Sequence, residues 1–127
     1  CLLSRGLGDV YKRQLQIGNR VTTADLELGG KKLPAGTYLH LSIAGANRDP
    51  KEFPEPERID IARKPNRHVA FAMGHHVCLG ATLARMEGQI AIGKLVRRFP
   101  KIMSSGPAIS MGLARFRGFN SMPVSIY

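Results

Sequence analysis

The sequence predicts an α+β fold in which short strands come first, a single long helix follows, and a weakly alternating tail ends the chain. Three observations support this prediction. Glycine-rich turns separate short apolar runs in residues 15–45. Residues 79–99 carry apolar side chains at spacings of about four, three and four, which is the period of a helix. The tail, residues 102–127, alternates weakly around two predicted turns, SSGP and RGFN. Because strand and helix signals occupy separate parts of the chain, a segregated α+β arrangement is expected.

The first 14 residues, CLLSRGLGDVYKRQ, show neither a helical nor a strand period. We expect residues 1–14 to be a non-native scar or a disordered segment, and we leave them out of the fold prediction. Residues 15–127 are treated as one part of a single domain.

Strand signals begin at Leu15. Gly29-Gly30 lies between the runs LEL and KKL and predicts a tight hairpin turn. Pro34-Ala-Gly36 predicts a second turn. In the following run, residues 38–43, apolar and polar side chains alternate as in a strand with one buried face.

The next segment, residues 46–68, contains four prolines, at positions 50, 54, 56 and 65. Proline lacks the backbone N–H that helices and central strands require. We therefore expect an irregular course here.

The sequence FAMGHHVCLG, residues 71–80, follows. Gly74 and Gly80 flank Cys78, and a helical pattern begins directly after it. Glycine allows the backbone to turn and to approach a flat ligand closely. The free N–H groups at a helix start favour a thiolate. Cys78 is therefore a candidate thiolate ligand. A zinc site is the alternative for Cys78 and its neighbouring histidines, but no second pair of ligands at zinc spacing is present.

The predicted helix spans residues 79–99 and ends at Pro100. Its apolar stripe comprises Leu79, Leu83, Met86 and Ile90, widened by Ala84, Ala91, Leu95 and Phe99. A stripe of this width predicts a largely buried helix. Basic residues gather near its C-terminal end, where cations suit the helix dipole.

The loop at residues 71–80 resembles the haem-binding loop of the cytochromes P450, FxxGxHxCxG, and the resemblance continues into LARME, residues 83–87. One position departs, because Ala72 stands where that family usually has Gly, Ser, Asn or His. The resemblance implies the C-terminal part of the mainly helical P450 fold: small β-strands, a proline-rich meander, the haem-binding loop, one long buried helix and a C-terminal β-hairpin. It covers nearly everything after residue 14, so we expect a fragment of a longer enzyme.

The resemblance also implies the roles of individual residues. Cys78 would be the axial thiolate on the iron of haem b, and Phe71 would pack under the porphyrin. Arg20 and His76 would contact haem propionates, for which a guanidinium fork is well suited. The remaining cofactor contacts would be Gly74 and Gly80. Substrate contacts would come from Leu15, Ile17, Phe116 and Phe119, at the start of the strand region and in a terminal hairpin whose RGFN turn projects toward the substrate.

Arg58 matches the family's meander arginine, which completes a Glu–Arg–Arg cluster with a preceding helix. The Glu-x-x-Arg pair of that helix is not in this sequence. We therefore expect Arg58 to be a buried charge without partners, at a cost of about 3–5 kcal/mol.

The resemblance implies a monooxygenase, with this fragment inactive by itself. The full enzyme would insert one oxygen atom from O2 into a small organic substrate, with electrons from a ferredoxin or flavodoxin that binds the basic end of the helix. Two alternatives remain open: a peroxide-using haem-thiolate enzyme, and an inactive remnant or basic binding module.

The composition argues against several other classes of protein. The formal charge is +10, but the basic residues are scattered without interleaved aromatics, which argues against nucleic acid. No run approaches the roughly 20 apolar residues of a membrane span. Two cysteines at distant positions indicate no disulfide framework, which fits a reducing compartment and a cytoplasmic protein.

Overall fold

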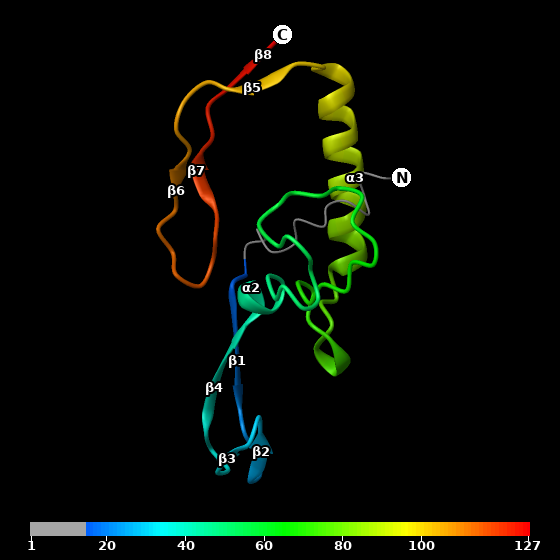
Figure 1. Ribbon diagram of the computed structural model, residues 1–127. Coiled ribbons are helices and arrows are strands. Elements are labelled where there is room, and N and C mark those ends of the chain that lie inside the picture. Colours follow the sequence, from blue (N-terminus) through cyan, green and yellow to red (C-terminus); the bar gives the residue numbers. More distant parts are fainter. Residues whose placement is uncertain (1–14) are drawn as a thin grey trace.

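The computed structural model describes residues 15–127 (Figure 1), so the prediction for residues 1–14 lies outside the described part. Its first ladder joins β1 (Ile17–Val21) and β4 (Tyr38–Ser42), which pair antiparallel with Asn19 opposite His40. Thr22 continues this ladder: its hydroxyl is buried and donates to the carbonyl of Pro34 at 2.6 Å. The ladder therefore ends on the predicted Pro34–Gly36 turn.

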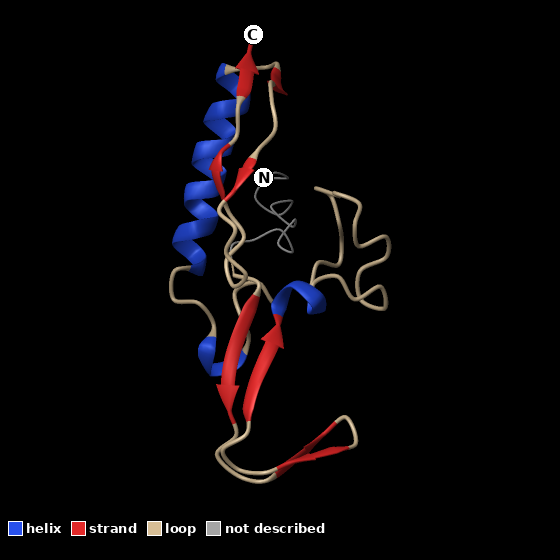
Figure 2. Cartoon of the chain, turned by 90° about the vertical axis from the view of Figure 1, so that its left-hand side faces the viewer, coloured by secondary structure: helices blue, strands red, loops and turns tan. Residues whose placement is uncertain are grey.

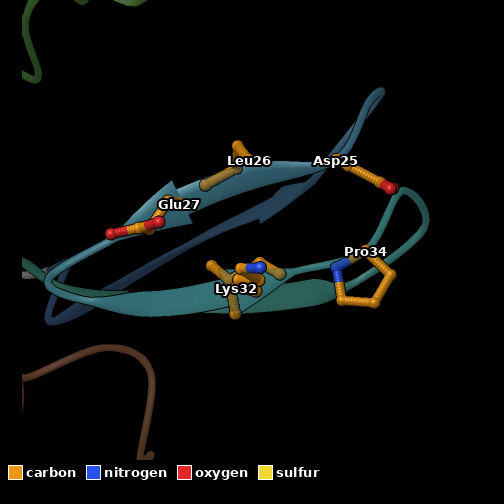
Figure 3. A pocket seen from close by; sticks show the side chains of 6 residues that line it. Asp25, Leu26, Glu27, Lys32 and Pro34 are labelled. Carbon is orange, nitrogen blue, oxygen red and sulfur yellow. The ribbon is translucent and has the colours of Figure 1, made fainter.

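A small hairpin lies beyond the end of this ladder. It consists of β2 (Leu26–Leu28) and β3 (Lys31–Leu33). Gly29 and Gly30 have φ of 56° and 75°, the left-handed pair that a tight hairpin turn requires. The prediction of a hairpin at this position is confirmed. A pocket of about 480 Å³ lies at this hairpin. Figure 3 shows side chains that line it, which come from the two strands and from the residues that flank them, Asp25 and Pro34.

After β4 the chain forms one short helical turn, α2 (Ile43–Ala46), capped by the Ser42 hydroxyl, which accepts a hydrogen bond from the N–H of Gly45 at 3.1 Å. Asn47 follows and is 2% exposed. Its side-chain oxygen accepts a hydrogen bond from the N–H of Val69 at 2.8 Å. Residues 48–73 contain no helix or strand, as the four prolines predicted. Asn47 thus holds the end of this irregular segment against its beginning.

The long helix, α3 (Ala81–Arg98), confirms the predicted helix to within two residues at its start and one at its end. The prediction that it is buried is wrong for this chain. Only Ala81 and Gly93 are buried, and its apolar residues Leu83, Met86 and Ile90 are each about half exposed. Within residues 15–127, no strand packs along the helix. The apolar stripe predicts which face of the helix would be buried. Burial also needs an element that covers this face, and the described part of the chain supplies none.

The tail forms a long hairpin, which confirms the predicted C-terminal hairpin (Figure 2). Its two ladders are β5 (Ile102–Ser104) with β8 (Val124–Ile126), and β6 (Ile109–Ser110) with β7 (Phe119–Ser121).

The turn positions in this hairpin differ from the prediction. The SSGP segment interrupts one arm between β5 and β6 rather than reversing the chain. The reversal occurs at residues 112–117, closed by the N–H of Met111 on the carbonyl of Gly118 at 3.0 Å. RGFN is therefore not the turn. Gly112, with φ of 69°, provides the left-handed position at the start of this reversal.

The elements are spread out along one direction. Both views show the β1–β4 ladder and the β2–β3 hairpin at one end and the C-terminal strands at the other (Figures 1 and 2). Among the described residues, the buried apolar side chains are those of Phe53 and Ala81. No helix of this part is both long enough and apolar enough to cross a bilayer.

Candidate functional site

The loop of residues 71–80 is held by its own backbone. The N–H of Cys78 donates to the carbonyl of Phe71 at 2.8 Å, and the carbonyl of Cys78 accepts from the N–H of Ala81 at 3.1 Å. The segment that the first bond spans contains a single 3-10 turn, η2 (Gly74–His76). The main chain on both sides of Cys78 is therefore fixed, by the start of the loop and by the first residue of α3.

Two residues of this loop have left-handed backbone angles. Gly74 has φ of 65°, and a Cβ added there would meet nothing within 4 Å. The need for glycine at this position is therefore conformational rather than steric. Ala72 has φ of 61°, a conformation that costs an L-residue other than glycine about 1–2 kcal/mol. This strain was not predicted from the sequence.

Cys78 is exposed and has a free thiol. Gly80 is the N-cap residue of α3, and a Cβ on it would lie 3.8 Å from Sγ of Cys78, an ordinary contact. The sulfur thus projects from the short link between the loop and the helix. Within residues 15–127, no three side chains of His, Cys, Asp or Glu are grouped as a metal site would require.

Arg20 and His76, the two expected propionate contacts, lie on one cavity. It has a volume of about 590 Å³ and is lined by β1, the β4–α2 junction and the loop. Leu15 and Ala72 also line it, whereas Phe71, Cys78 and Ile17 are not among its lining residues. Arg20 is exposed, and its guanidinium donates to the carbonyl of Asn19 at 2.7 Å. The structure therefore brings together two cationic or ionisable side chains that are 56 positions apart in the sequence.

Of the expected substrate contacts, Leu15 and Phe116 form an isolated antiparallel bridge, and the N–H of Gln16 donates to the carbonyl of Arg115 at 2.9 Å. This bridge places the tip of the C-terminal hairpin beside the cavity that Leu15 lines. Ile17 pairs with Ser42 inside the ladder. Phe119 lies in β7, beyond the turn. Leu15 and Phe116 are thus paired with each other, whereas Ile17 and Phe119 pair with Ser42 and Ser110.

The expectation that Arg58 is a buried, unpaired charge is wrong. Its side chain is 70% exposed and donates to Glu55 at 3.0 Å. The meander places this guanidinium in solvent, where its charge remains hydrated and the ion pair has little effect on the free energy of unfolding.

Sequence reasoning also missed a contact across the loop. The guanidinium carbon of Arg85, on α3, lies 4.7 Å from the centre of the Phe71 ring, and His68 meets the same ring edge-on at 6.1 Å. Arg85 belongs to the LARME segment, but a separation of 14 residues between loop and helix has no periodic signature.

The chain is similar to known proteins in both sequence and structure. The cytochrome P450 family model matches residues 15–119. The chain is 40% identical over 114 residues to a putative cytochrome P450 140 of Mycobacterium tuberculosis, covering 88% of this chain and 26% of that protein. It is 39% identical over 116 residues to the biotin biosynthesis cytochrome P450 of Bacillus subtilis, covering 91% of this chain and 29% of that protein. The chain therefore spans little more than a quarter of the length of these relatives.

Solved structures agree. The P450BioI complex with a fatty acid linked to acyl carrier protein superimposes with a TM-score of 0.94 at 36% identity, covering 99% of this chain and 34% of that one. CYP109E1 from Bacillus megaterium with testosterone gives 0.89 at 35% identity, covering 97% and 35%. Both the family model and the superpositions cover nearly all of the described fold, and the chain belongs to the cytochrome P450 family.

Proposed function

We propose that this chain is the thiolate-donating part of a haem-thiolate monooxygenase. The observation that carries the proposal is the Cys78 loop: backbone hydrogen bonds fix the cysteine on both sides while its thiol remains exposed. A thiol with these properties is available to a ligand that approaches from outside the loop.

The residues present fit a haem. Its propionates are anionic, and Arg20 and His76 line one cavity beside the loop. The exposed guanidinium of Arg20 has donors to offer beyond its bond to Asn19. The same cavity is otherwise largely apolar, with Leu41, Ile43 and Val69 among its lining residues, as a porphyrin edge requires. Cys78 would hold the iron, and Arg20 and His76 would hold the propionates. Haem b is the form we propose.

When bound through a thiolate, the haem supplies dioxygen activation, and the electron donation from sulfur favours O–O cleavage. The chain's own task would be to present the Cys78 sulfur to the iron, to fix its direction through the bond to Phe71, and to neutralise the cofactor's carboxylates. The overall reaction of the complete enzyme would consume one molecule of substrate, one O2, two electrons and two protons, and yield one hydroxylated product and one water.

We further propose an acidic electron donor, a ferredoxin or flavodoxin. Arg97, Arg98 and Lys101 are exposed near the end of α3, and the chain as a whole has a formal charge of +10. A surface of this sign attracts acidic proteins over long distances and orients them before contact. Location in the cytoplasm, expected from the cysteine content, remains a prediction.

The substrate that we propose is a small, mainly apolar organic molecule. Two relatives were solved with ligands of this chemistry, a fatty acid on acyl carrier protein and testosterone. In this chain, the exposed side chain of Phe116 and the bridge from its residue to Leu15 offer an apolar surface beside the cavity.

The test uses a chimera in which residues 15–127 replace the matching segment of the Bacillus subtilis biotin biosynthesis P450. We expect its ferrous carbon monoxide complex to show the red-shifted Soret band of thiolate ligation, and Cys78→Ser to abolish that band. His76→Ala should weaken haem binding, whereas the adjacent His75→Ala, at a position without an assigned role, is the matched control. A band that survives Cys78→Ser would remove this cysteine as the ligand.

The same chimera separates the two oxidant chemistries. Substrate turnover with a ferredoxin, its reductase and O2 supports the monooxygenase. Turnover with hydrogen peroxide but none with the ferredoxin system would contradict the two-electron reaction and support the peroxide-using alternative.

A further inference from the structure

Arg85 connects the helix to the beginning of the cysteine loop. Its guanidinium carbon lies 4.7 Å from the centroid of the Phe71 ring, within the range of a cation–π contact. Among residues 15–127, Arg85 takes part in no ion pair. The aromatic face of Phe71 is therefore the contact that the structure gives to this cation.

Phe71 is also the residue that holds the ligand cysteine. Its carbonyl accepts the N–H of Cys78 at 2.8 Å, and the carbonyl of Cys78 in turn accepts the N–H of Ala81, the first residue of α3. The helix then carries Arg85 back over the ring of Phe71. Backbone bonds, helix and cation–π contact thus form a closed ring of interactions that contains Cys78.

His68 limits how the Phe71 side chain can respond. Its ring meets Phe71 edge-on, with centroids 6.1 Å apart and planes 62° from parallel. Phe71 is consequently contacted by an aromatic ring from the preceding segment and by a guanidinium from the helix. Without the guanidinium, one of these two lateral contacts would be lost.

We propose that Arg85 is a positioning residue for the cysteine ligand and acts through Phe71. The guanidinium holds the Phe71 ring, the fixed Phe71 main chain holds the Cys78 N–H, and the direction of Sγ follows from this. The proposal rests on the proposed function only in taking Cys78 as the ligand. A lysine would retain the charge but not the planar group that stacks on a ring, so arginine is the residue that this contact favours.

The experiment measures hydrogen exchange of individual amides in the 127-residue chain without haem. Removing an exposed cation–π contact should raise the exchange rate of the Cys78 amide about two- to fivefold in Arg85→Met. Arg85→Lys should restore part of the protection. The Ala84 amide, bonded to the carbonyl of Gly80 at 2.8 Å, reports on α3 itself and should not change.

Two further variants make the test specific. Arg97→Met removes an equal charge from the same helix at a site where the side chain lies over Gly93 rather than Phe71, and it should leave the Cys78 amide unchanged. Phe71→Leu removes the aromatic face, and Arg85→Met added to it should have no further effect. If Arg85→Met raises the exchange rate of the Cys78 amide equally in the parent chain and in Phe71→Leu, the proposal is overturned.

Three other results would also overturn it: an unchanged Cys78 amide in Arg85→Met, an equal rise at Cys78 and Ala84, or a Cys78 amide that is unprotected in the parent chain. Because this readout needs no cofactor, it is independent of the haem-binding test above. Absence of the thiolate Soret band in the parent chimera would refute the proposed function, while a selective Cys78 amide response would still establish the positioning contact.

Discussion

Replacing Ala72 by glycine should make this chain more stable, although glycine usually does the opposite. Ala72 has φ of 61°, in the left-handed region. That conformation costs alanine about 1–2 kcal/mol. The added freedom of glycine in the unfolded chain costs about 0.4–1 kcal/mol. The difference predicts a gain of about 0.5–1 kcal/mol in the free energy of unfolding for Ala72→Gly.

The assay is urea unfolding followed by circular dichroism. We expect a higher midpoint with an unchanged slope, since the substitution alters one backbone position rather than the surface exposed on unfolding. Ala91→Gly is the matched control. Ala91 is exposed in the middle of α3, and glycine there should lower stability by about 1 kcal/mol.

The argument requires that Ala72→Gly raises the free energy of unfolding and that Ala91→Gly lowers it. If Ala72→Gly lowers the midpoint as Ala91→Gly does, the backbone of Ala72 is not strained and the argument fails. Ala72→Asn offers a second check, because asparagine tolerates the left-handed region better than alanine does.

Other predictions follow from single contacts. Asn47→Ala should lower the free energy of unfolding by about 1–3 kcal/mol in urea titrations, because the N–H of Val69 loses its acceptor, the buried side chain of Asn47; no change would show that the N–H finds another partner. Arg58→Ala should change it by less than about 1 kcal/mol, since the pair with Glu55 is exposed; a loss of several kcal/mol would restore the expectation of a buried charge. Arg20→Met should weaken haem binding in a spectroscopic titration of the chimera while leaving the thiolate Soret band in place, and loss of the band itself would contradict a role confined to the propionates.

Much of the local structure was predictable because it depends on neighbouring residues. Gly29-Gly30 fixed its hairpin through backbone angles that only glycine adopts easily. The helix was predicted from its apolar period and from Pro100 at its end. The hairpin reversal was misplaced because two glycines, at 112 and 118, compete for it, and only the backbone angles decide between them.

Burial was less predictable, because a pattern identifies an apolar face but not what covers it. For this reason α3 was expected to be buried and is mostly exposed. For the same reason Arg58 was given a buried environment that the chain does not provide. The candidate site was recognised through the spacing around Cys78. The contact between Arg85 and Phe71 and the strain at Ala72 could not be seen, since neither leaves a sequence period.

The ring of contacts around Cys78 also bears on the order in which this chain acquires its structure. All of its members lie within residues 68–85. Closing a short loop costs little chain entropy, and the cost grows with the logarithm of loop length. Local contacts of this kind form faster than pairings between distant segments, such as the bridge of Leu15 with Phe116. The geometry of the cysteine is therefore specified by short-range contacts and can be reached before the C-terminal hairpin meets the start of β1.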